Sequence, residues 1–245
     1  VGMQAMPSVD GDDDSNNPRN SHHLDDATLG EALISFIKSS RFWLICTSIM
    51  CLTILMAFQN FLPIYLKEIF HLSSGKAGIA SSVFPLGSMF SIILGGFIFD
   101  KLTKKSRVFV LGGMMALATG CVVILLLLPK SHLQENSALW VALSAIMVYG
   151  LMIAPCYLIP MSVFSVDFGG KHCGVLVGII DAAGYLASMI FEFWGGAVAD
   201  RVDGWQQFLF IILNISAIGT ITLILFLFID YRSIIKPKEE TKANN

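Results

Sequence analysis

Six apolar runs divide this chain, and each is close to the length that crosses a membrane. Charged residues make up only 14% of the 245 residues, against about 25% in soluble domains, and they gather between the runs. A membrane-spanning helix needs about 20 apolar residues. The runs predict spans at about 42–66, 77–99, 108–128, 138–165, 172–198 and 206–229. We therefore expect an all-α membrane protein with six transmembrane helices.

The apolar runs lie between two polar ends. Residues 1–40 are predicted to form an acidic, disordered cytoplasmic loop, residues 41–231 the membrane domain, and residues 232–245 a cytoplasmic tail. The first 40 residues lack the basic and then apolar pattern of a signal peptide. Because the sequence begins with Val1 rather than Met, it indicates a fragment or a processed product.

The end of the acidic loop carries a helical pattern. Over residues 27–38, Leu29, Leu33, Phe36 and Ile37 recur at the spacing of one helical face. This pattern predicts an amphipathic helix, which either lies along the membrane surface or simply leads into the first span.

The distribution of Lys and Arg predicts how the spans are oriented. A short turn after the second span, residues 100–107, holds Lys101, Lys104, Lys105 and Arg107. Alternating the loops from this turn places twelve Lys and Arg residues on its side of the membrane and four on the other. Since loops rich in Lys and Arg stay in the cytoplasm, we expect both termini to be cytoplasmic.

Composition and motifs exclude several classes of function. The formal net charge is −2 and no basic and aromatic pattern occurs, so no nucleic-acid partner is expected. The five cysteines form no Cys-x-x-Cys pair and the five histidines no His-Glu-x-x-His, so we expect neither a metal site nor a cofactor. No Ser/Lys or His/Asp constellation occurs in the spans, and an enzyme is not expected.

Polar side chains within the apolar runs mark candidate cavity residues. In the first span, Gln59 and Asn60 precede Pro63, which is expected to loosen the helix there. In the fourth span, Tyr149 and Tyr157 accompany two prolines that predict a bent helix. A buried amide in such a position either binds substrate or bridges neighbouring helices.

The fifth span carries a polar stripe. Its spacing places six residues on one helical face: Gly174, Gly178, Asp181, Tyr185, Ser188 and Glu192. A carboxylate in the apolar layer usually faces a bundle interior or a wet cavity. Asp181 is therefore expected to bind substrate or carry a proton, the alternative being a structural hydrogen bond to a neighbouring helix. Tyr185 and Ser188 are further cavity candidates, Glu192 is expected to be solvated, and the two glycines predict a close helix contact.

The turn after the second span resembles the cytoplasmic signature of the major facilitator superfamily. Gly96, Asp100, Lys101, Lys104 and Lys105 fit that pattern, while Thr103 stands where the family has a second glycine. The resemblance implies a gate turn in which Asp100 faces the positive N-terminal end of span five. A plain basic turn, held in the cytoplasm by its charge, is the alternative.

The same resemblance implies an architecture. The six spans would form the C-terminal half of a twelve-helix bundle, with an absent N-terminal six-helix half as partner and residues 1–40 as the loop between the halves. Spans one and four would line the cavity, and spans two and five would contact the other half. Two copies of a six-helix chain are the alternative way to reach twelve helices.

Within that superfamily, two stretches resemble the organophosphate:phosphate antiporters. They are residues 63–68 and residues 178–186, the second followed by Asp203-Gly204-Trp205. The resemblance implies a transporter of small organic solutes, such as organic anions or phosphate esters, exchanged for phosphate by alternating access. One departure stands out: bacterial members carry a phosphate-binding arginine in the span that corresponds to the first one here, Leu55 lies near that position, and no span contains Lys or Arg. The alternatives are a proton-coupled symporter of a non-phosphate solute and a non-transporting membrane sensor.

Overall fold

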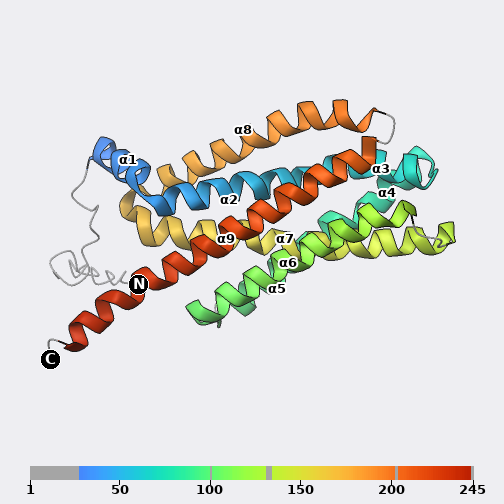
Figure 1. Cartoon of the computed structure of the whole chain (residues 1–245). Coiled ribbons are helices and arrows are strands. Elements are labelled where there is room, and N and C mark those ends of the chain that lie inside the picture. The colour runs from blue at the N-terminus through green and yellow to red at the C-terminus, as the bar shows by residue number, and fades with distance from the viewer. Residues whose placement is uncertain (1–27, 100, 131–133, 202–203, 244–245) are drawn as a thin grey trace, which may run out of the picture.

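The computed structural model describes residues 28–99, 101–130, 134–201 and 204–243, and this part of the chain forms a bundle of long helices (Figure 1). The α-helices are α1 Leu29–Lys38, α2 Ser40–Ala57, α3 Leu62–Ile69, α4 Ser74–Ser81, α5 Val83–Phe99, α6 Lys104–Leu127, α7 Glu135–Gly169, α8 Cys173–Ala199 and α9 Gly204–Ala243. Short 3-10 turns lie at Phe58–Asn60, Leu128–Lys130 and Gly170–His172. Residues 1–27, for which the sequence predicts an acidic loop, lie outside the described residues.

The bundle contains six membrane helices. Five stretches of the described chain are long and apolar enough to cross a membrane: Ser40–Asn60, Ser74–Phe99, Lys105–Leu127, Asn136–Ala199 and Gly204–Arg232. The fourth stretch, of 64 residues, holds both α7 and α8. The 3-10 turn between them begins at Gly170, whose φ of 50° is a conformation that glycine adopts without a Cβ clash. The all-α membrane fold predicted from the sequence is confirmed.

Proline affects the first and fourth membrane helices differently. Helix α2 ends at Ala57, and α3 begins at Leu62 with Pro63 in its first turn, where the missing N–H of proline is tolerated. Helix α7 instead continues through both Pro155 and Pro160. The α-helical geometry of the first membrane span is therefore interrupted at Gln59 and Asn60, which lie in the 3-10 turn Phe58–Asn60.

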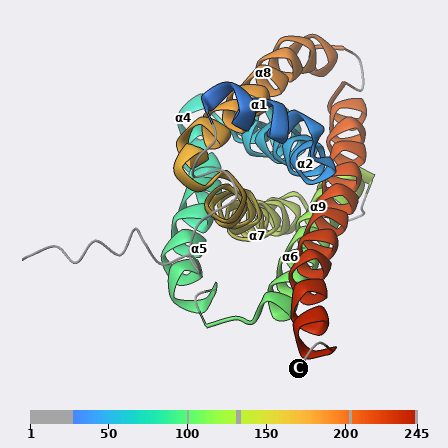
Figure 2. The same ribbon diagram turned by 90° about the vertical axis from the view of Figure 1, so that its left-hand side faces the viewer.

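Helices α2 and α7 lie at the centre of the bundle. Helix α7 packs against α5 and α6, α2 packs against α8 and α9, and α2 and α7 also contact each other. Viewed along the bundle, α5 lies on one side of α7, and α6 and α9 lie on the other (Figure 2). Large apolar side chains remain exposed on α5 and α8, among them Phe97 and Phe193. Such surfaces suit lipid or another helical unit rather than water.

Helix α1 begins with a capping box. The Thr28 hydroxyl accepts a hydrogen bond from the backbone N–H of Glu31, and the Glu31 carboxylate accepts one from the backbone N–H of Thr28 at 2.8 Å. The hydrogen bonds from Thr28, backbone first, lower the pKa of the Glu31 carboxyl. This reciprocal pairing satisfies two N–H groups that a helix start leaves open.

The buried side of α1 differs from the predicted apolar face. Phe36 is fully buried, with its ring 5.7 Å from that of Phe168 at the end of α7, and Ala32 is buried beside it. Leu29 and Ile37 are about half exposed. Phe36 of the predicted face is therefore used in packing against Phe168, and the placement of α1 along the membrane surface or as a lead-in to the first span stays a prediction.

Helix α1 and the C-terminal part of α9 lie at the same end of the bundle (Figure 1). There Arg41 of α2 forms an ion pair of 3.5 Å with Asp230 of α9. The Arg41 guanidinium also lies 5.2 Å from the centre of the Phe168 ring. An even number of membrane helices requires this arrangement, because each crossing returns the chain to the opposite side.

Candidate substrate cavity and gate turn

A hydrogen bond between α7 and α8 joins two of the predicted cavity residues. The Tyr157 hydroxyl donates to Oδ1 of Asp181 at 2.9 Å, and both side chains are partly accessible. Tyr185, one turn further along α8, lies close enough to interact with the Tyr157 hydroxyl and is itself exposed. An ionised carboxylate accepts hydrogen bonds at both oxygens. Asp181 can therefore hold Tyr157 and still accept a hydrogen bond from the hydroxyl group of a ligand.

A second polar cluster lies further along α8. The Asn60 amide donates to Oε1 of Glu192 at 3.1 Å, and the Ser188 hydroxyl donates to the same oxygen at 3.2 Å. The expectation that Glu192 is merely solvated was wrong, because the break after α2 turns Asn60 toward α8. Eleven residues separate Asp181 from Glu192, about 16 Å along a helix. The two clusters are thus distinct sites.

The remaining cavity candidates differ in accessibility. Gln59 is exposed in the 3-10 turn after α2. Tyr149 is fully buried, and its hydroxyl donates to the backbone oxygen of Leu55 at 3.0 Å while its ring packs against Phe58 and Phe84. In this structure Tyr149 therefore belongs to the packed core, where it joins α7 to α2.

The gate turn is described only in part. Lys101 and Lys105 are exposed, and no heavy atom lies within 4 Å of a Cβ built on Gly96, apart from its own helix backbone. Thr103 is the N-cap of α6, since its hydroxyl accepts from the backbone N–H of Ser106 at 3.3 Å. Thr103 thus supplies a side-chain cap that a glycine at this position would lack. Asp100 and the Lys104 side chain lie outside the described part, so the contact of Asp100 with α8 stays a prediction.

The glycines of α8 differ in their surroundings. Among the described residues, no neighbouring atom lies within 4 Å of a Cβ built on Gly174 or Gly178. Gly184 makes the close contact of α8 instead, since its Cβ would lie 2.6 Å from the Thr53 hydroxyl oxygen of α2. Because the family resemblance places span five against the other six-helix half, the close contact predicted for Gly174 and Gly178 stays a prediction.

The sequence analysis also missed a close backbone contact between α5 and α7. A Cβ on Gly87 of α5 would lie 2.3 Å from the backbone oxygen of Met147, and one on Gly150 of α7 would lie 2.4 Å from that of Phe84. The Ser88 hydroxyl donates to the backbone oxygen of Gly150 at 3.1 Å. Small residues that let two backbones meet are typical of membrane helix pairs.

The sequence analysis also missed two polar contacts made by α9. The hydroxyl groups of Thr119 and Ser216 lie 2.7 Å apart and join α6 to α9, and Thr220 lies one turn away. At the other end of the bundle the Trp205 indole donates to Oε2 of Glu68 at 2.6 Å. The spacing of four between Ser216 and Thr220 was the available signal for the first contact.

The sequence profile of the Major Facilitator Superfamily matches residues 9–192. The chain belongs to this superfamily. Family membership agrees with the packing just described, in which two central helices are flanked by four others. It also makes the chain a multi-pass integral membrane protein.

Three curated relatives illustrate the similarity. The human glucose-6-phosphate exchanger SLC37A1 is 25% identical over 211 residues, which is 81% of this chain and 38% of that protein. A probable hexose phosphate transport protein of Chlamydia pneumoniae is 24% identical over 80% of this chain and 42% of its own length. The phosphoglycerate transporter protein of Salmonella typhimurium is 25% identical over 72% of this chain and 36% of its own length. The chain thus spans well under half the length of these relatives.

Proposed function

We propose that the chain is the second six-helix half of a secondary transporter for small organic anions, phosphate esters among them, which are exchanged for phosphate by alternating access. The observation that carries the proposal is the partly accessible Tyr157–Asp181 pair between α7 and α8. An intramembrane carboxylate is retained where it serves a transport path. The names of the relatives supply the substrate class.

The proposed site divides recognition between the two halves. No Lys or Arg occurs within the six apolar runs, yet a phosphate group in a dry cavity needs a fixed cation. We assign that cation to the N-terminal half. Asp181 and Tyr157 would then bind hydroxyl groups of the substrate, and the Lys and Arg bias would keep both termini cytoplasmic.

Counterflow uptake by the intact protein in proteoliposomes tests this assignment. Vesicles loaded with phosphate are offered labelled glucose 6-phosphate, glycerol 3-phosphate, an uncharged sugar or a dicarboxylate. The proposal expects phosphate-driven uptake of a phosphate ester and none of the uncharged sugar. Well-folded protein that takes up nothing would favour a non-transporting sensor.

The carboxylate of Asp181 also supports a second candidate, a proton-coupled symporter of another solute. An Asp181→Asn variant separates the two candidates, because the asparagine side chain accepts hydrogen bonds but does not bind and release a proton at neutral pH. If Asp181 is a substrate ligand, the variant shows a raised KM in exchange. If Asp181 is the proton carrier, the variant loses uptake driven by a pH gradient and keeps exchange between equal pools.

A further inference from the structure

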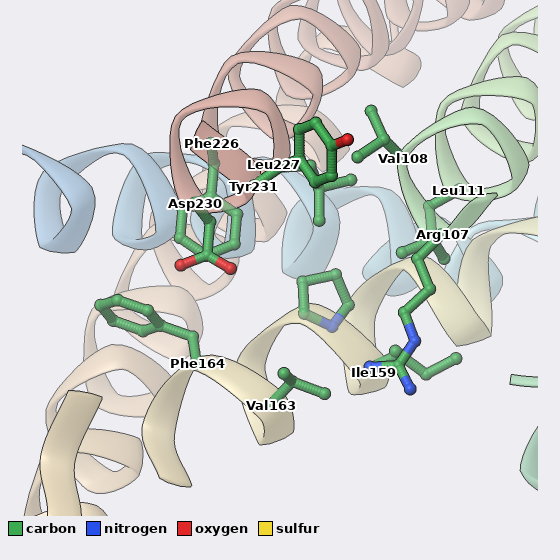
Figure 3. A pocket seen from close by; sticks show the side chains of 11 residues that line it. Arg107, Val108, Leu111, Ile159, Val163, Phe164, Phe226, Leu227, Asp230 and Tyr231 are labelled. Atoms are coloured by element: carbon green, nitrogen blue, oxygen red, sulfur yellow. The ribbon is translucent and has the colours of Figure 1, made fainter. Parts of the chain in front are cut away.

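A narrow pocket opens between α6, α7 and α9 at the end of the bundle that carries the gate turn. Its volume is about 40 Å³. Apolar side chains form most of its wall, among them Val163, Phe164 and Leu227 (Figure 3). The polar groups at the pocket are Arg107, Asp230 and Tyr231.

Arg107 brings a cation into this apolar surrounding. Its Nε is buried and has no hydrogen-bond partner among the described residues. Figure 3 shows the guanidinium beside Ile159, on the far side of the pocket from the Asp230 carboxylate. Asp230 is in turn engaged by Arg41 at 3.5 Å. A buried donor without an acceptor is costly, so this pocket favours a ligand that brings an anionic oxygen.

The surroundings of Arg107 add positive charge. Lys105 is exposed on the first turn of α6, and that turn contains no acidic residue. The N-terminal end of a helix favours negative charge. Lys101, also exposed, lies just before this helix. The Arg107 side of the pocket is therefore complementary to an anion, while the apolar wall is complementary to a hydrocarbon chain.

The apolar wall of the pocket favours a lipid over a soluble anion as its ligand. The pocket lies where α6 begins, and α6 and α9 lie on the other side of α7 from α5 (Figure 2). An apolar wall beside a phosphate-binding guanidinium suits an amphiphile, whereas a free phosphate would gain nothing from Phe164 or Leu227. Basic pockets between membrane helices on the cytoplasmic side bind anionic head groups.

We propose that this pocket binds an anionic phospholipid of the leaflet that faces the gate turn. Its phosphate accepts hydrogen bonds from Arg107, and part of an acyl chain lies against Val163 and Leu227. The proposal rests on the membrane fold and not on the proposed transport. A transport assay and a lipid-binding assay therefore fail independently.

Native mass spectrometry of the intact protein tests the proposal, with phosphatidylglycerol and phosphatidylcholine titrated separately. We expect tighter binding of phosphatidylglycerol, weakened at least tenfold by Arg107→Gln, as for the loss of a charge-assisted hydrogen bond. Arg232→Gln is the matched control, because Arg232 is exposed at the same end of the bundle and stacks on Phe228 at 4.5 Å. That control should keep the wild-type affinity.

Three results would overturn the proposal. Equal binding of the two lipids would remove the charge recognition, and equal losses in the two arginine variants would indicate a diffuse charge effect. Displacement of phosphatidylglycerol by millimolar inorganic phosphate would make this a soluble-anion site. If Arg107→Gln does not fold, Val163→Trp keeps the cation and fills the groove, and unchanged phosphatidylglycerol binding by that variant would equally refute the assignment.

Discussion

The two faces of α7 meet their neighbours in opposite ways. Toward α5 the backbones themselves touch, with Gly87 and Gly150 leaving no room for a Cβ and Ser88 hydrogen-bonded across the contact. Toward α8 a polar contact joins two side chains, the hydroxyl of Tyr157 and the carboxylate of Asp181. A backbone contact has one good geometry. A pair of side chains can separate and change partner, so a site that must bind and release a solute is expected at α8 rather than at α5.

The largest effect is expected from a methyl group added to the α5–α7 contact. Gly150→Ala places a Cβ 2.4 Å from a backbone oxygen, and overpacking of this kind costs about 3 kcal/mol. Thermal unfolding in detergent should show a clearly lowered midpoint. Gly113→Ala on α6, where no neighbouring atom lies within 4 Å, is the control. Equal midpoints for the two variants would contradict the backbone contact.

A smaller loss is expected where α8 meets α2. Gly184→Ala places a Cβ 2.6 Å from the Thr53 hydroxyl oxygen, but a side chain can move where a backbone cannot. We expect a cost of about 1–2 kcal/mol, which Thr53→Ala in the same chain restores, since contacting residues are coupled. Chemical denaturation of the single and double variants measures this. If the losses in unfolding free energy of the two single variants simply add in the double variant, the added methyl group does not clash with Thr53.

Tyr157→Phe should change function more than stability. It removes one hydrogen bond to Asp181, worth about 1 kcal/mol, or about fivefold in KM for exchange. Combined with Asp181→Asn, the loss should be less than the sum because the two groups act together. A lowered unfolding midpoint with unchanged KM would show that the pair is structural.

The smallest effect is expected from Ser88→Ala, which removes a hydrogen bond on the α5 side of α7, where Tyr157→Phe removes one on the α8 side. Ser88→Ala removes the hydrogen bond to Gly150, and such bonds in membrane proteins average about 0.6 kcal/mol. A slightly lowered unfolding midpoint with wild-type exchange kinetics is expected. If Ser88→Ala alters KM and Tyr157→Phe does not, the two sides of α7 have been assigned the wrong way round.

The sequence predicted what depends on the chain alone. Apolar runs of membrane length specify helices whatever their neighbours are, so the fold class and the family were predicted correctly. The cost of exposing a carboxylate to lipid indicated that Asp181 needs a polar partner, and the Tyr157 hydroxyl is one. Features that depend on the register between helices were not predictable in this way. Gly174 and Gly178 have the spacing of a helix contact and meet no neighbour among the described residues, while Gly87 and Gly150, 63 positions apart, both lie where α5 meets α7.

In the candidate site, too, the sequence identified polar residues but not their packing partners. Asn60 and Glu192 were both visible as polar residues, but their hydrogen bond joins positions 132 residues apart. It depends on the break in the first membrane helix before Pro63. Tyr149 resembles Tyr157 in sequence context and lies in the packed core, because its hydroxyl meets the Leu55 carbonyl. Polarity within an apolar run identifies candidates, and only packing separates a ligand from a structural bridge.

The position of α1 and the end of α9 at one end of the bundle has an evolutionary consequence. A unit that crosses the membrane an even number of times leaves the chain on the side where it entered. A tandem copy of its gene segment, joined by a linker that never crosses, would insert in the same orientation as the first. Duplication and fusion therefore need no new crossing and no inverted copy, and either copy can diverge without disturbing the topology of the other.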